Sequence, residues 1–180
     1  DCIESPHGRG LAVASAVKRA RPQNIVFTYQ GDGDLAAIGA GETIHAANRG
    51  ENVTVVFVNN SVYGMTGGQM APTTLIGQRT ATTPRGRSVQ AEGYPLKISE
   101  LIAQLDGASY VERCSCDCPK GILKTKGAIK AGFLNQIEGK GFSLIEILSA
   151  CPTYWNLSPL ESIEWMKNSL MKEFPLGRLK

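Results

Sequence analysis

The feature that most constrains this chain is a strand, turn, helix and strand pattern in its first third. Residues 25–29 and 53–58 are two runs of β-branched and other apolar residues. Between them lie a glycine-rich turn at 31–34 and a segment at 35–48 that is typical of a helix and ends before Gly50. This unit joins two parallel strands by a right-handed crossover. The second run is continuous enough to predict a strand that is buried on both faces.

The remainder of the chain repeats this alternation. We therefore predict an α/β fold, a mainly parallel sheet with helices on both faces, in a single domain over residues 1–180. Forty-two per cent hydrophobic residues suit one sizeable core. Residues 69–94 lack any clear period and predict a long surface loop, which in compact domains is often functional. Further helices are predicted at 11–20, 98–105, 122–137 and 159–170, and strands at 108–112 and 142–148.

Composition excludes some classes of partner. The net charge of +3 is too small and too evenly spread to indicate nucleic acid. No apolar run has the length that spans a bilayer, so we expect no membrane partner. Five cysteines, an odd number, argue against a disulfide framework and favour a reducing, cytoplasmic location.

Three polar or glycine-rich segments follow predicted strands. They are residues 31–34, Asn59-Asn60 and residues 149–152. Ligands of parallel sheets gather beyond the carboxyl ends of the strands, so the chemistry is expected where these segments meet.

The glycine turn poses an electrostatic problem. Residues 31–36 fit the loose dinucleotide pattern G-x-G-x-x-A, and a dinucleotide-binding Rossmann-type module is one alternative. That pattern expects an acid after the second strand, where this chain has Asn59 and Asn60, and Asp32 would repel a pyrophosphate. A divalent cation resolves the conflict, because Mg²⁺ binds carboxylates and phosphates together.

The spacing of these two motifs carries a resemblance. Gly31-Asp32-Gly33, followed after 25 residues by Asn59-Asn60, resembles the thiamine diphosphate motif. The resemblance implies a thiamine diphosphate-binding fold of the PP type. It also implies that Asp32, Asn60 and the carbonyl of Val62 coordinate Mg²⁺.

Further segments narrow the resemblance to the beta subunit of 2-oxoacid:ferredoxin oxidoreductases. They are His7-Gly8-Arg9, residues 44–46, 59–69 and 71–74, and Cys151-Pro152-Thr153. The implied reaction is oxidative decarboxylation of a 2-oxoacid with coenzyme A, yielding acyl-CoA, CO₂ and reduced ferredoxin. Implied partners are alpha- and gamma-type subunits, one of which supplies the glutamate that activates the cofactor, so no catalytic acid or base is assigned here. Cofactor contacts are expected from His7, Gly31, Asp32, Gly33, Asp34, Asn60, Val62, Gly64, Met65 and Thr66.

Met65 bears on the substrate. Pyruvate-specific relatives tend to have Asn at this position, and an apolar side chain favours a bulkier, branched-chain 2-oxoacid. A non-oxidative thiamine-dependent decarboxylase is the alternative within the same cofactor class.

The cysteines fall into two groups. In the resembling family Cys151 matches one ligand of a [4Fe-4S] cluster, whose other three ligands lie in an upstream segment that we expect this chain to lack. Either that segment was lost from this chain, or it resides in another chain, or the protein has no such cluster. Cys114, Cys116 and Cys118 are interpreted as free cysteines rather than metal ligands.

Several other side chains have two interpretations. Arg9 is expected either to neutralise phosphate or to pair with an acid, and His45 to lie on a solvated or ion-paired helix face. Loop arginines 79, 85 and 87 either guide an anionic partner or are ordinary surface residues.

Overall fold

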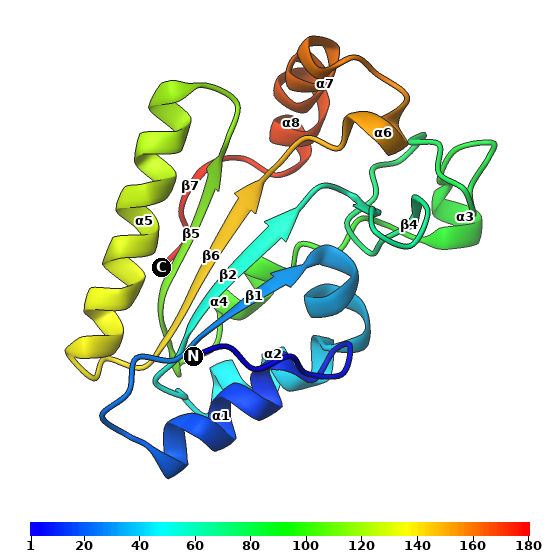
Figure 1. Cartoon of the computed structure of the whole chain (residues 1–180). Coiled ribbons are helices and arrows are strands. Elements are labelled where there is room, and N and C mark those ends of the chain that lie inside the picture. The colour runs from blue at the N-terminus through cyan, green and yellow to red at the C-terminus, as the bar shows by residue number, and fades with distance from the viewer.

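A computed structural model describes all 180 residues, and its centre is a five-stranded sheet (Figure 1). Four strands are parallel in the order β1-β2-β6-β5, and β7 adds to β5 in the antiparallel sense. The predicted mainly parallel sheet is therefore confirmed. The strands are β1 (Phe27–Gly31), β2 (Thr54–Asn59), β5 (Ala108–Ser115), β6 (Phe142–Leu148) and β7 (Gly177–Arg178), and a separate two-stranded ribbon pairs β3 (Val62–Tyr63) with β4 (Gln69–Met70).

Helices cover both faces of the sheet (Figure 1). On one face, helices α1 (Gly10–Ala20), α2 (Ala40–Asn48) and α4 (Ile98–Ala103) enclose the largest apolar cluster with alternate residues of β2, including Val55 and Phe57. On the other face, α5 (Pro119–Ile137) packs through Ala128. Since successive strand residues point to opposite faces, β2 contributes to both cores, as its sequence predicts.

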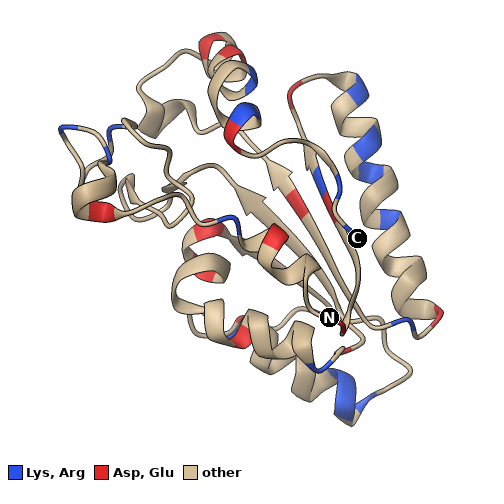
Figure 2. Cartoon of the chain, turned by 180° about the vertical axis from the view of Figure 1, so that it is seen from behind, with Lys and Arg blue, Asp and Glu red and all other residues tan.

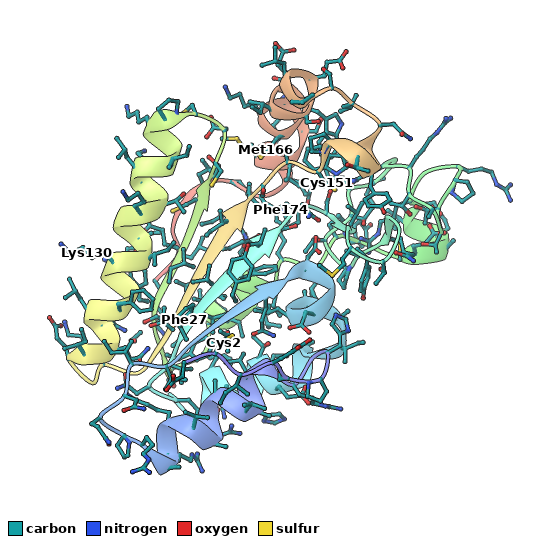
Figure 3. All side chains as sticks on the ribbon, viewed as in Figure 1. Cys2, Phe27, Lys130, Cys151, Met166 and Phe174 are labelled. Carbon is teal, nitrogen blue, oxygen red and sulfur yellow. The ribbon has the colours of Figure 1, made fainter.

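A third apolar cluster lies at the carboxyl ends of the strands. Leu148, the last residue of β6, packs with Met166 and Phe174, and Figure 3 shows these two side chains close to that end of the sheet. Trp155 and Trp165 pack against the same cluster, with ring centroids 4.4 Å apart. The remaining short elements are α3 (Val89–Glu92), α6 (Pro152–Trp155), α7 (Pro159–Trp165), the π-helical turn η2 (Met166–Leu170) and α8 (Met171–Glu173).

Several predicted elements differ in extent. The first strand begins two residues later than expected, at Phe27, and the main chain of the preceding residue, Val26, is bonded to the side chain of Gln136. The strand after α4 is longer and includes Cys114. The final predicted helix, 159–170, is divided by the π-helical turn η2.

The predicted helix at 35–48 is also interrupted. It consists of a π-helical turn, η1 (Asp34–Ile38), followed by α2, with Gly39 between them. The amide of Gly39 donates to the carbonyl of Asp34, 2.8 Å away, a bond spanning five residues. A Cβ at Gly39 would lie 2.6 Å from that oxygen and 2.9 Å from the carbonyl oxygen of Gly8, so close backbone packing sets the interruption.

The longest helix, α5, has 19 residues and carries several lysines along its length (Figure 2). No helix in the structure combines the length and the apolarity that a membrane crossing requires.

Two glycines of α5 give a matched test of how the helix packs. A Cβ at Gly127 would have no neighbour within 4 Å, so Gly127→Ala should raise the free energy of unfolding by about 0.5–1 kcal/mol through helix propensity. At Gly132 a Cβ would lie 2.7 Å from Cδ1 of Ile145 and 3.0 Å from Cγ2 of Thr54. Gly132→Ala should therefore lower the free energy of unfolding by about 1 kcal/mol or more. Urea denaturation measures both, and equal effects would contradict this packing.

Candidate functional site

The three segments predicted to meet do so at one edge of the sheet. β1, β2 and β6 are neighbours and parallel, so the residues that follow them emerge together at their carboxyl ends (Figure 1). The glycine turn follows β1, Asn60 follows β2, and Cys151 lies shortly after β6.

Asp32 lies at the centre of this edge. Its residue is 3% exposed, and its carboxylate accepts hydrogen bonds from the amide of Gly33 at 3.0 Å, the amide of Asn60 at 3.2 Å and the hydroxyl of Thr73 at 3.2 Å. The carboxylate thus joins the ends of β1 and β2 to the long loop. No cationic side chain pairs with Asp32 in any ion pair of the structure.

Burial dominates the electrostatics of Asp32. It raises the pKa of this carboxyl to about 6, although the three hydrogen-bond donors oppose the shift. A buried carboxylate without a counter-charge is costly, and a bound cation would remove that cost. The residue therefore fits the role of a metal ligand on its burial and its lack of a partner.

The glycine at position 33 is required by the packing of Tyr63. A Cβ there would lie 2.0 Å from the tyrosine ring, so no other residue fits without moving β3. Burial, and secondarily the negative charge of Asp32, raise the pKa of Tyr63. The aromatic ring thus packs directly on the turn that carries the carboxylate.

Asp34 faces a different set of donors. Its carboxylate accepts a hydrogen bond from the amide of Gly8 at 2.5 Å and another from the side chain of Gln30. The Nε2 atom of His7 is 3.5 Å from the same carboxylate, and the imidazole is 6.5 Å from the ring of Tyr63. The second acid of the turn therefore holds the chain segment before α1 beside the site.

Asn60 and Val62 belong to one tight turn. The Oδ1 atom of Asn60 accepts the amide of Val62 at 3.3 Å, and the indole N–H of Trp155 donates to the Asn60 carbonyl at 3.1 Å. The turn passes through Ser61, a non-glycine residue with φ of 61°. The backbone amide of Asn60 contacts Asp32, so the carboxylate and this turn are brought together.

The segment that follows crosses the same edge. A Cβ at Gly64 would lie 3.6 Å from Nδ2 of Asn60 and 3.7 Å from Sγ of Cys151, so this glycine lies between the two. Met65 is fully exposed, and the hydroxyl of Thr66 bonds to the side chain of Gln69. Figure 3 shows Cys151 at this edge.

Comparison with known proteins identifies the domain. Residues 3–147 match the family of the thiamine pyrophosphate enzyme C-terminal TPP binding domain. The chain belongs to this family. It is 48% identical to ketoisovalerate oxidoreductase subunit VorA of Methanothermobacter marburgensis, over all of this chain and 38% of that protein. It is 31% identical to the 2-oxoacid:ferredoxin oxidoreductase subunit beta of a Sulfolobus species, over 94% of this chain and 51% of that protein.

A solved structure agrees with these relatives. The 2-oxoglutarate:ferredoxin oxidoreductase from Magnetococcus marinus, with 2-oxoglutarate, coenzyme A and succinyl-CoA bound, matches 90% of this chain with a TM-score of 0.73 and 30% identity. The chain covers 50% of that protein chain. The resemblance to 2-oxoacid:ferredoxin oxidoreductases and the thiamine diphosphate-binding fold are confirmed, and the dinucleotide-binding alternative is not retained.

Two other cysteines of the TPP-binding domain, Cys114 and Cys118, lie in the core and at the start of α5. Cys114 is buried in the α5-side core, where burial and then Glu112 raise its pKa to about 11. The Sγ atom of Cys118 accepts the amide of Gly121 at the start of α5. All five cysteines are free, and no group of three or more His, Cys, Asp or Glu side chains is arranged to hold a metal ion. The proposed Mg²⁺ site is not such a group, because it combines one carboxylate with amide and carbonyl oxygens.

Neither interpretation of Arg87, as an anion guide or as an ordinary surface residue, is correct. Arg87 is only 5% exposed, and its guanidinium donates to six main-chain carbonyls of the long loop rather than facing a partner. Burial lowers the pKa of Arg87. Arg9 pairs with Glu42, in agreement with one of its two interpretations.

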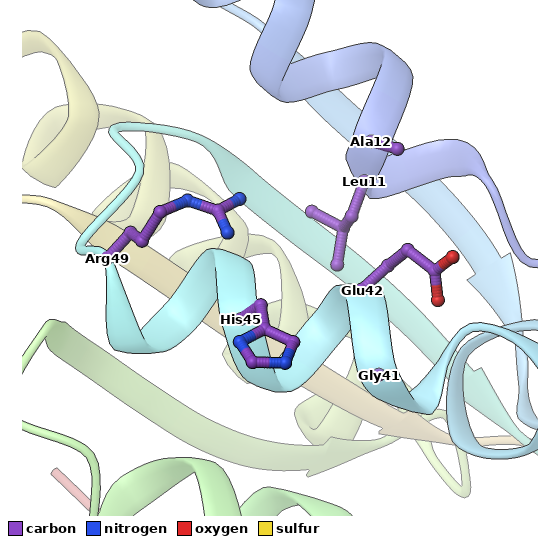
Figure 4. Close-up of a pocket in the computed structure, with 6 residues that line it drawn as sticks. All are labelled: Leu11, Ala12, Gly41, Glu42, His45 and Arg49. Atoms are coloured by element: carbon purple, nitrogen blue, oxygen red, sulfur yellow. The ribbon is translucent and has the colours of Figure 1, made fainter.

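His45 lies on an exposed helix face, in agreement with the expected solvated face, and forms no ion pair of its own. The neighbouring Glu42 pairs with Arg9, and Arg49 pairs with Glu51. The exposed imidazole instead lines a pocket of about 420 Å³ along α1 and α2 (Figure 4). Apart from that histidine the pocket is lined by Leu11, Ala12, Gly41, Glu42 and Arg49, none of which is a predicted cofactor contact.

Sequence reasoning missed two contributors to the site. The hydroxyl of Thr73, from the long loop, donates to Asp32, and the indole N–H of Trp155 donates to the carbonyl of Asn60. The Ala-Pro-Thr-Thr sequence at 71–74 was part of the family resemblance, and it was the available signal for Thr73.

The raised pKa of Asp32 predicts how the metal-free protein responds to pH. The folded carboxyl, with a pKa of about 6, holds its proton more tightly than the unfolded one at about 3.9. Its contribution to stability is therefore greatest below the unfolded pKa and declines as pH rises through the folded pKa. Between about pH 4 and pH 7, wild type should lose about 2 kcal/mol of unfolding free energy relative to Asp32→Asn. Urea titrations in chelator measure this difference, and a constant difference would contradict the burial argument.

Proposed function

We propose that this chain is the thiamine diphosphate- and magnesium-binding part of a 2-oxoacid:ferredoxin oxidoreductase that converts a branched-chain 2-oxoacid to its acyl-CoA. The observation that carries the proposal is the buried carboxylate of Asp32, which has no cationic partner and contacts Asn60 at the carboxyl ends of β1 and β2. The names of the relatives support the reaction class, although the chain spans about half or less of their lengths.

The chain's own residues have the chemistry to anchor the cofactor. Asp32, Oδ1 of Asn60 and the carbonyl of Val62 are oxygen ligands, which Mg²⁺ prefers, and phosphate oxygens complete such sites. When bound, thiamine diphosphate supplies the electron sink for the carbanion that remains after loss of CO₂. The proposed lining of the cofactor consists of His7, Gly31, Gly33, Asp34, Gly64, Met65 and Thr66.

The site as proposed is shared with other chains. The glutamate that activates the cofactor is assigned to a partner of the alpha or gamma type, and this chain binds and orients without a catalytic acid or base of its own. Ferredoxin and coenzyme A are the proposed further partners. Cys151, half-buried beside Gly64, is proposed as one ligand of a [4Fe-4S] cluster, with the other ligands supplied from outside these 180 residues. Five free cysteines favour work in the reducing cytoplasm.

Asp32 gives the direct test of the cofactor site. Thiamine diphosphate with Mg²⁺, at about 100 times its dissociation constant, should raise the Tm of the enzyme assembled from its subunits by about 5 °C or more. Asp32→Asn should abolish this shift, because it removes the charge that binds the metal. NAD⁺ should produce no shift in either protein.

Asp106→Asn is the matched control, since Asp106 is exposed in the turn before β5 at the opposite edge of the sheet. A shift that persists in Asp32→Asn would refute the metal assignment. Ferredoxin reduction that requires coenzyme A would then separate the oxidative reaction from a simple decarboxylase.

Met65 tests the substrate class. Its side chain is fully exposed on this chain and is free to contact a substrate bound at the carboxyl edge. Met65→Asn removes apolar contact surface, so kcat/KM for 2-oxoisovalerate should fall about tenfold relative to that for pyruvate. Steady-state ferredoxin reduction with each acid measures the ratio. An unchanged ratio would exclude Met65 as a specificity residue.

A further inference from the structure

A buried ion pair joins two strands in the interior of the sheet. Arg113 on β5 and Glu146 on β6 are each 1% exposed, and Nε of Arg113 is 2.8 Å from Oε2 of Glu146. The guanidinium also forms two bonds to Glu100 of α4, at 2.8 and 2.6 Å. Buried ion pairs seldom add net stability, so this one requires another explanation.

Glu146 uses both carboxylate oxygens as acceptors. Oε2 accepts from Arg113 and from the hydroxyl of Ser99, while Oε1 accepts from Nδ2 of Asn59 at 2.8 Å. Every group that faces this carboxylate is a donor. The carboxylate therefore dictates which end of the Asn59 amide points toward it.

The fixed amide of Asn59 determines the geometry of the next turn. With Nδ2 directed to Glu146, Oδ1 of Asn59 is left to accept the amide of Ser61 at 3.1 Å. Ser61 is fully buried and has φ of 61°, a conformation that a side chain disfavours. Its carbonyl also accepts the Thr74 hydroxyl, and its own hydroxyl accepts the Gln78 amide at 2.8 Å.

We propose that Glu146 is a positioning residue for the turn at residues 60–62, which carries the proposed Mg²⁺ ligands Asn60 and Val62. Through Asn59, Glu146 holds Ser61 in the left-handed conformation that presents these two ligands. This inference rests on the proposed function. The acid acts from the middle of β6 and contacts no proposed ligand itself. Residues of this kind commonly change metal affinity by about 10- to 100-fold when they are altered.

Glu146→Gln tests the mechanism because a glutamine has one acceptor and one donor. If its oxygen stays on Arg113, its amide nitrogen faces Nδ2 of Asn59, and Asn59 must rotate and present Nδ2 to the Ser61 amide. The turn then loses its acceptor. In the assembled enzyme at saturating thiamine diphosphate, Mg²⁺ affinity measured by calorimetry should fall at least about tenfold. The amide of Ser61 should also exchange with deuterium faster.

Glu100→Gln is the matched control, because Glu100 pairs with the same arginine but does not contact Asn59. It should lower Tm and leave Mg²⁺ affinity and Ser61 exchange at wild-type values. Equal losses of affinity in both variants would show a general effect of stability and would overturn the proposal. Unchanged affinity in Glu146→Gln would overturn it as well.

Asn59→Ala decides the matter if Glu146→Gln does not fold, since it leaves the ion pair of Arg113 and Glu146 in place. It should show the same loss of Mg²⁺ affinity, and wild-type affinity in this variant would overturn the proposal. Failure of the proposed function is distinct, because wild type itself would then bind neither Mg²⁺ nor thiamine diphosphate.

Discussion

The buried carboxylate of Asp32 is the constraint on which the arrangement of the carboxyl edge depends. It is tied by hydrogen bonds to its own turn, to the end of β2 and to the long loop, yet it lacks a counter-charge. Such a group destabilises the fold that holds it unless a proton or a cation neutralises it. The carboxyl edge is therefore held at a cost in stability that a proton or a bound cation would relieve. A bound cation would also remove the repulsion between Asp32 and an anionic ligand.

The scaffold around this carboxylate is correspondingly rigid. β1 and β2 are parallel neighbours, so their ends must lie side by side, and Tyr63 packs so closely on Gly33 that the turn has little freedom. The long loop is held from within by Arg87, whose buried guanidinium replaces the regular hydrogen bonding that the loop lacks. Thr73 can then reach Asp32 from a segment without regular structure. Loops that carry function on a fixed scaffold follow the same logic.

The sequence was sufficient for contacts that local patterns encode. Apolar runs predicted the strands, parallel pairing brought the turn and Asn60 together, and β6 has the bounds that its pattern predicted. Local patterns could not predict contacts between side chains on distant segments. The pairing of Arg113 with Glu146 joins residues 33 apart, and each lies in a stretch that is typical of a plain strand. The break at Gly39 was missed for a similar reason, because it depends on packing against Gly8 rather than on local propensity.

The outer face of β1 bears on how the site is completed. Strands of parallel sheets are usually covered on both faces, but Phe27 and Tyr29 on this edge strand are 54% and 73% exposed. These side chains lead directly to the turn that carries Asp32, and α5 reaches only as far as Phe27, through Phe133. An apolar strand face left open beside the proposed cofactor turn is the feature expected of a surface that another chain covers. It agrees with the proposal that the activating glutamate comes from a partner chain.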